Sequence, residues 1–229
     1  LNIHENTILW YCSDNGGLPK YGSTGGRGHK GQIYEGGLRV PAMIEWPARI
    51  PRNPQPINTP ANTVDIYPTL LDIIQATVYQ QTPLDGISLL PIIDGTIQQR
   101  PQGMGFWDRS SSKGTPVYAE KWMQELLALQ AQGKQITDPA RLKMDAADIT
   151  VQYPEDAFPG HAAWLQWPWK LHRIESEKGK VKFELYNLEK DPMEADNQVE
   201  QQSERVMAMQ SDLNKWLVSV VRSSNGIDY

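Results

Sequence analysis

Two short stretches near the start of the sequence carry side chains that could hold ions of opposite charge. Asp14 and Asn15 follow the apolar segment at 7–12, within the run SDNGG. Carboxylate and amide oxygens are the ligands that Ca²⁺ and Mg²⁺ prefer. Lys30 follows His29 in the glycine-flanked run RGHKG, and its compact ammonium suits an oxygen of a sulfate or phosphate group. The two stretches are therefore a candidate site for a cation and an anion side by side.

Taken alone, the same residues have a simpler explanation in ordinary loop chemistry. Asp-Asn-Gly-Gly is a common turn sequence, and a loop lysine is usually only solvated. Arg27 could bind an anion, although pairing with one of the chain's many carboxylates is the simpler interpretation. His29 need not point the same way as Lys30. A Ca²⁺ ion takes about 6 to 8 oxygens, so other residues or a substrate would have to complete any metal site.

The elements around these stretches predict an α/β layer. Residues 7–12 have the apolar, β-rich composition of a buried strand, and the many glycines after them predict a long loop. A second strand is expected at 40–46. A helix is expected at 63–75, and its start is fixed near Asp65 because Pro68 is tolerated only in the first turn. Loops that leave the carboxyl ends of strands in such sheets are where ligands bind. The apolar stripe of the expected helix is Ile66, Leu70, Ile73 and Ile74.

The C-terminal part of the sequence predicts a smaller antiparallel unit. The runs at 163–174 and 180–188 are β-like and are joined by a charged turn at 175–179. A final helix is expected because apolar residues then recur at three- and four-residue spacing. Its face is Val206, Met209, Leu213, Trp216 and Val220.

We therefore expect three regions along the chain. Residues 1–100 form the C-terminal portion of an α/β domain, and residues 101–160 form an irregular bridge with an amphipathic helix near 119–132. Residues 161–229 form a small antiparallel sheet covered by a helix.

Composition argues against several classes of function. The chain has 229 residues and a net charge of -5, so it offers no basic field for nucleic acid. No apolar run approaches the roughly 20 residues needed to span a membrane. The single cysteine, Cys12, excludes an intrachain disulfide and a multi-cysteine zinc site. The GxxxxGK, GxSxG and HExxH motifs do not occur.

Some C-terminal residues are candidates for contact with a substrate. His161, in the run PGHAAW, is the best candidate among the histidines, although a structural histidine is the simpler interpretation. His172 and Lys170 share one face of their β-like run. Four tryptophans could stack on sugar rings, but tryptophan more often packs in a core. They are Trp107, Trp164, Trp167 and Trp169.

Five ordered blocks of the sequence resemble the C-terminal half of the formylglycine-dependent sulfatases, which belong to the alkaline-phosphatase-like superfamily. The blocks are TILWYCSDNGG, RGHKGQIYEGGLRVPAMIEWPARI, TVDIYPTLLDII, LDGISLLPII and FELYNLEKDPMEADN. The resemblance is dense over 1–100, moderate over 160–200 and weak between them. It implies the α/β fold of that superfamily, truncated, with a small antiparallel sheet subdomain and its covering helix.

The resemblance also implies roles for individual residues. Asp14 and Asn15 match the family's calcium ligands, and Lys30 matches the lysine that binds the sulfate and the nucleophile. Arg27, His29 and His161 remain candidates for contacting the substrate. The implied activity is that of a sulfuric ester hydrolase acting on a sulfated carbohydrate or an aryl sulfate. Family membership implies a periplasmic or secreted location, where calcium is plentiful.

The sequence departs from the family pattern at the nucleophile. The formylglycine of the family is made within CxPSR or CxAxR, and neither motif occurs. Cys12 is followed by Ser-Asp-Asn, so it does not match that nucleophile. The family's N-terminal aspartate pair and upstream histidine are also missing. We therefore expect a fragment that is inactive alone and whose partner is the missing N-terminal half of the same protein.

Two alternatives stay open from the sequence. A phosphodiesterase or phosphonate hydrolase of the same superfamily would keep Asp14 and Asn15 but use a different nucleophile. A non-catalytic glycan-binding remnant would keep the fold without any nucleophile.

Overall fold

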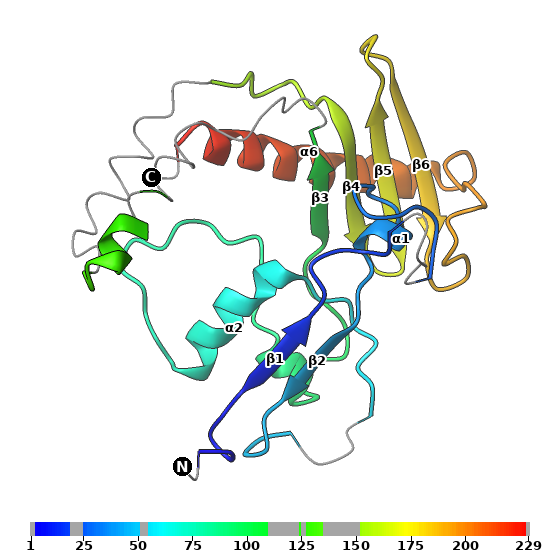
Figure 1. The fold of residues 1–229 in the computed structure, drawn as a ribbon. Helices are drawn as coiled ribbons and strands as arrows, with labels where there is room; N and C mark the ends of the chain where they lie inside the picture. The colour runs from blue at the N-terminus through cyan, green and yellow to red at the C-terminus, as the bar shows by residue number, and fades with distance from the viewer. Residues whose placement is uncertain are drawn as a thin grey trace.

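Two antiparallel sheets organise the chain (Figure 1). The computed structural model describes residues 3–18, 25–50, 55–109, 124, 127–134 and 152–227. One sheet has the order β1-β2, and the other has the order β3-β4-β5-β6. The expected class is confirmed, since a partial α/β layer is followed by a small antiparallel sheet with a covering helix.

The first sheet pairs β1 (Leu9–Cys12) with β2 (Ala42–Glu45), so that Cys12 lies opposite Ala42. We expected a strand buried on both faces, but the side chains of Leu9 and Tyr11 are more than half exposed, at 54% and 55%. The reason is that β2 is the only described strand that pairs with β1 and no described element covers its outer face. The predicted strand is therefore confirmed, but the prediction that it is buried on both faces is wrong.

The predicted helix at 63–75 is present in two pieces. The 3₁₀ turn η1 (Thr63–Asp65) leads into α2 (Ile66–Ile73), with Pro68 in the first turn of α2 as expected. The apolar stripe is only partly covered, because Leu70 is 40% and Ile74 is 68% exposed. The short helix α3 (Leu90–Ile93) follows α2 in the chain.

Asp65 ties this region together. Its side chain is fully buried and accepts two hydrogen bonds from the Arg100 guanidinium, at 2.7 and 2.9 Å. The same carboxylate accepts the backbone N–H groups of Asn62 and Ile87. A buried carboxylate is tolerated only when its charge is paired and its oxygens are hydrogen-bonded, and Asp65 meets both conditions.

The second sheet contains β3 (Met104–Asp108), β4 (Gly160–Gln166), β5 (Trp169–Glu175) and β6 (Val181–Asn187). The run at 163–174, read as one segment from the sequence, is two strands that turn back at Trp167 and Pro168. Proline lacks the N–H that a ladder needs, so the chain leaves the sheet there.

β3 lies within the region expected to be an irregular bridge, and it supplies the first strand of the C-terminal sheet. In that bridge, residues 124 and 127–131 are helical, as expected of the amphipathic helix. The rest of the expected helix lies outside the described residues.

The helix α6 (Ser203–Ser224) packs on one face of this sheet. Its buried side chains are Val206, Met209, Leu213, Leu217 and Val221. The predicted face is correct for its first half. Near the end of the helix Trp216 and Val220 are only half-buried, and the residue after each of them is the buried one.

Strand alternation gives the sheet one apolar face and one polar face. Trp164, Leu171 and Leu185 lie in the core beneath α6. The residues between them point to the other side, where the glycine-rich loop and α1 (Glu35–Leu38) lie in front of the sheet in Figure 1. The polar face comprises His161, Lys170, His172, Glu184 and Tyr186.

No helix among the described residues is long and apolar enough to cross a bilayer.

Candidate functional site

The two loops that carry the candidate ion ligands lie side by side. The backbone N–H of Lys30 donates to the carbonyl of Gly17 at 2.9 Å, and the N–H of Gly16 donates to the carbonyl of Gly37 at 2.9 Å. The first bond joins the SDNGG loop, at the carboxyl end of β1, to the RGHKG loop, and the second joins it to α1 (Glu35–Leu38). The structure therefore brings together two stretches that are separate in the sequence.

Glycines make this close approach possible. A Cβ on Gly16 would collide with the carbonyl oxygen of Gly36, and a Cβ on Gly36 would collide with the carbonyl oxygen of Gly28. A Cβ on Gly37 would collide with the carbonyl oxygen of Gln32. The glycine pairs are thus packing requirements of this site, because backbone meets backbone at each of them.

The candidate cation ligands match a hard metal ion in their chemistry. Asp14 is exposed, and its carboxylate has no hydrogen bond or ion pair with a described residue. Asn15 donates its amide nitrogen to the carbonyl of Gly16 at 3.4 Å, which leaves the amide oxygen available. Among the described residues there is no group of three or more His, Cys, Asp or Glu that could hold a metal. Asp14 and Asn15 therefore fit a calcium site in kind and would form only part of it.

Lys30 is exposed at the surface of the neighbouring loop, and its ammonium makes no bond with a described residue. His29 Nδ1 lies 2.9 Å from the carbonyl oxygen of Lys30. Since a carbonyl only accepts, Nδ1 carries the proton and Nε2 is the free nitrogen. The catalytic role of Lys30 and the substrate-binding role of His29 remain predictions.

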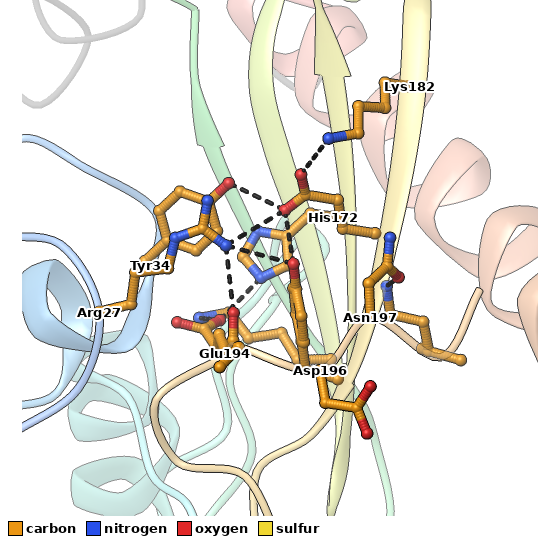
Figure 2. A network of polar contacts seen from close by, with 12 residues as sticks. Arg27, Tyr34, His172, Lys182, Glu194, Asp196 and Asn197 are labelled. Atoms are coloured by element: carbon orange, nitrogen blue, oxygen red, sulfur yellow. Dashed lines mark hydrogen bonds and ion pairs between the residues drawn. The ribbon is translucent and has the colours of Figure 1, made fainter.

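Arg27 is held by the C-terminal sheet (Figure 2). Its guanidinium stacks on Tyr34 at 3.9 Å from the ring centre and donates to the Tyr186 hydroxyl and the Glu194 carbonyl at 3.2 and 3.1 Å. The carboxylate of Glu184 lies 3.6 Å away. The pairing interpretation of Arg27 is confirmed, and its substrate-binding role remains a prediction.

His161 begins a chain of hydrogen bonds. Its Nε2 lies 2.8 Å from His172 Nδ1, and His172 Nε2 lies 2.8 Å from Glu194 Oε1. Because a carboxylate accepts, His172 donates from Nε2, and neutral His172 then accepts from His161. Burial, with the nearby His172 and Lys170, lowers the pKa of His161 to about 4, and burial lowers the pKa of His172 well below its usual range. The predicted substrate contact of His161 remains a prediction.

Glu194 links the glycine-rich loop to the sheet. It is fully buried and accepts the backbone N–H of Glu35, the first residue of α1, at 2.7 Å. Lys170 Nζ lies 3.1 Å from Glu194 and donates to Glu35 Oε1 at 2.8 Å. Glu35 is thus ion-paired with Lys170 of β5. The sheet therefore fixes α1, and with it the loop that carries Lys30.

A second buried carboxylate, Glu184, accepts hydrogen bonds from both Tyr34 and Tyr186 at 2.9 Å. Burial alone would raise its pKa, but hydrogen bonds from Lys182, Tyr186 and Tyr34 outweigh burial and lower the pKa of Glu184 to about 2. Burial and the bond to Glu184 raise the pKa of Tyr186 to about 12. The carboxylate is therefore ionised and both phenols are protonated at neutral pH.

Sequence reasoning missed Glu184 and Glu194 as parts of this region. Part of the signal was available, since Lys170 and His172 were seen to share a face. The register places His172 opposite Glu184 and Lys170 opposite Tyr186, so polar residues alternate on both strands. Glu194 lies in the loop after the last strand, where its backbone φ is 51°. Because it belongs to neither a strand nor a helix, no periodic pattern in the sequence points to it.

Comparison with known proteins identifies the first third of the chain. The family model "Sulfatase" matches residues 1–76. Human steryl-sulfatase is 29% identical over 109 residues, which are 43% of this chain and 18% of that protein. Bovine N-acetylglucosamine-6-sulfatase is 28% identical over 207 residues, which are 84% of this chain and 31% of that protein.

The fold agrees with these matches. The crystal structure of Ps i-CgsB superimposes with a TM-score of 0.63 at 19% identity, over 94% of this chain and 37% of that one. The chain thus spans less than a third of the length of both curated relatives. Residues 1–76 are therefore similar to the sulfatase family, the alignment to the bovine relative extends over most of the chain, and the fold is that of the solved structure.

Proposed function

We propose that this chain supplies the cation-binding and anion-binding loops of a sulfuric ester hydrolase. The observation that carries the proposal is the backbone bond between Lys30 and Gly17. It joins the loop of Asp14 and Asn15 to the loop of Lys30, whose ammonium makes no bond with a described residue. All three side chains fall within the segment that the sulfatase family model matches.

Each side chain has a role in this proposal. Asp14 and Asn15 contribute oxygens to a Ca²⁺ ion, which when bound would polarise the sulfate oxygens. The Lys30 ammonium holds a sulfate oxygen and balances the negative charge that grows on the leaving oxygen. The nucleophile, a formylglycine, comes from outside these 229 residues, in the N-terminal part of the same polypeptide.

The C-terminal sheet positions the loop. Lys170 and Glu194 hold Glu35, so α1 cannot shift without breaking buried ionic hydrogen bonds. Such rigidity supports catalysis because a charged group must meet the reacting atoms in a fixed geometry. Arg27 and His161 are hydrogen-bonded to Tyr186 and His172 of the same polar face. Both remain candidates for contacting the substrate.

A sulfated carbohydrate is the proposed substrate class, with an aryl sulfate as a simpler substrate. The bovine relative is named for a sulfate on N-acetylglucosamine, and Ps i-CgsB also has a structure in complex with k-i-k-neocarrahexaose. We place the enzyme in the periplasm or outside the cell, where a calcium site is readily filled.

The test is a substrate panel on the complete polypeptide that contains this chain. We expect hydrolysis of 4-methylumbelliferyl sulfate that is lost with a calcium chelator and restored by Ca²⁺. The 229-residue chain alone should release no sulfate. Preference for a phosphodiester such as bis(4-nitrophenyl) phosphate would overturn the sulfatase assignment in favour of the phosphoester alternative.

A further inference from the structure

A groove separate from the ion-binding loops opens where β3 begins and β4 ends. Its volume is about 570 Å³, and it is lined by residues 56–60, 92, 95, 97–104 and 165–167. Pockets for small ligands commonly have volumes of about 300 to 1,000 Å³. None of Asp14, Asn15 or Lys30 lines it.

Trp167 gives the groove an aromatic surface. It stands in the turn between β4 and β5, and 44% of it is exposed, whereas Trp164 of the same sheet is buried in the core. The packing interpretation of the tryptophans therefore holds for Trp164 and fails for Trp167. An exposed indole offers a flat apolar face with a polar edge, which is the surface that the C–H groups of a pyranose ring pack against.

Amide side chains surround this aromatic surface. Asn58, Gln98, Gln99 and Gln166 line the groove and are exposed, and their side chains form no hydrogen bond with a described residue. An amide both donates and accepts, so each one can bind a hydroxyl in either sense. The Thr59 hydroxyl donates to the Gln98 carbonyl at 2.8 Å, which ties two walls of the groove together.

The described lining residues of the groove carry no free charge. Arg100 is the one ionisable residue among the described lining residues, and both of its terminal nitrogens are bound to Asp65. The pair is electrically balanced, while Arg100 Nε is buried without a partner among the described residues. A sulfate would meet no uncompensated cation here, and an anion without a partner is costly to desolvate. Hydroxyl groups match the lining better.

We propose that this groove binds an uncharged stretch of a saccharide chain, with a sugar ring stacked on Trp167 and hydroxyls bound by the surrounding amides. The site is a binding subsite and takes no part in bond cleavage. It goes beyond the proposed hydrolase activity, and it would exist whether or not the loops at Lys30 hydrolyse sulfate esters.

The experiment measures binding without turnover, on the complete polypeptide that contains this chain, with neutral probes that carry no sulfate to hydrolyse. The probes are a neutral β-1,4-linked galactose hexasaccharide and a neutral β-1,4-linked glucose hexasaccharide. We expect at least one of them to give saturation-transfer NMR signals and a calorimetric Kd below about 5 mM, which corresponds to roughly 3 kcal/mol of binding free energy. No binding of either hexasaccharide would overturn the proposal.

Three variants locate the bound sugar. Trp167→Ala should weaken binding about tenfold, a loss of roughly 1.4 kcal/mol, and Gln99→Ala should weaken it less. The matched control is Tyr79→Ala, since Tyr79 is an exposed aromatic residue, 88% accessible, that does not line the groove. Circular dichroism should show all three variants folded, as expected for exposed positions.

Two outcomes would contradict the assignment of this groove. Equal affinity in Trp167→Ala and the parent chain would place the bound sugar elsewhere. Binding only of a sulfated galactose hexasaccharide, and not of the neutral one, would exclude an uncharged site. Substitution of Lys30 by alanine should leave the affinity for the neutral probe unchanged, so a failure of the hydrolase proposal is distinguishable from a failure of this one.

Discussion

Asp65 shows how a single side chain can join distant parts of the chain. It accepts bonds from Asn62, Ile87 and Arg100 and is fully buried. Removing one partner of a buried ion pair leaves the other charge uncompensated, which usually costs more than a surface change does. The region between β2 and β3 therefore depends on this carboxylate.

Replacement of Asp65 by alanine should lower the free energy of unfolding by about 3 to 5 kcal/mol, because buried Arg100 and two backbone N–H groups lose their acceptor. Urea denaturation of the 229-residue chain measures this change. Asp212→Ala is the matched control, since Asp212 is a partly exposed residue of α6 whose one ion pair among the described residues is with Lys215. An effect of Asp65→Ala no larger than that of the control would contradict the role described here.

At the scale of elements, the glycine-rich loop is held by contacts that only glycine permits. Gly36 is the second residue of α1, and its Cα lies against the carbonyl groups of Gly28 and Arg27. The loop carrying Lys30 therefore packs its backbone against the backbone of α1, and Lys170 and Glu194 hold α1 in place through Glu35.

Gly36→Ala should move this loop and destabilise the chain by about 2 kcal/mol or more, because a methyl group would overlap backbone atoms that cannot move independently. The control is Gly31→Ala in the same loop. Gly31 has a φ of 87° and open space around its Cβ position, so it should cost only about 1 kcal/mol of backbone strain. Thermal unfolding of both variants distinguishes them, and equal losses would show that packing at Gly36 is unimportant.

The elements differ in how well the sequence predicted them. The final helix and the start of α2 were predicted because apolar spacing and Pro68 are local signals. The split of one β-like run at Trp167 was missed, since three aromatic residues around a proline have strong strand propensity. The exposed outer face of β1 was also missed, because burial depends on which partners the described chain supplies and not on the strand's own composition.

The candidate site was predicted only in part. Asp14, Asn15 and Lys30 were proposed from residue type, and the structure shows that their loops meet, while their roles remain predictions. Glu184 and Glu194 were not predicted, because their hydrogen-bond partners are distant in the sequence and become neighbours only in the folded chain. Neither residue lies in a sequence motif that would point to those partners.

At the scale of the whole molecule, the hydrogen-bond chain from His161 through His172 to Glu194 couples stability to pH. In the unfolded chain His161 takes up a proton below its ordinary pKa of about 6.5, whereas in the folded chain its pKa is about 4. Between these values the unfolded state binds more protons, so stability falls as pH falls through this window.

The melting temperature should therefore drop between about pH 6.5 and pH 4, and His161→Gln should remove part of this drop. We expect a difference of about 3 °C or more between the parent chain and the variant, from the size of the chain. His4→Gln is the control, because His4 is exposed. Identical pH profiles for the parent and His161→Gln would contradict the neutral state of this partly buried histidine.

The central claim is that Asp14 and Lys30 serve one site. The most direct test is a double-mutant cycle in the complete polypeptide, with kcat/KM for 4-methylumbelliferyl sulfate as the measurement. We expect Lys30→Ala and Asp14→Ala each to lower kcat/KM about 100-fold or more, while Lys178→Ala, at an exposed turn, leaves it unchanged. In a shared site the double variant loses much less than the product of the two single losses. Wild-type activity in either single variant, or two losses that multiply fully, would contradict the claim.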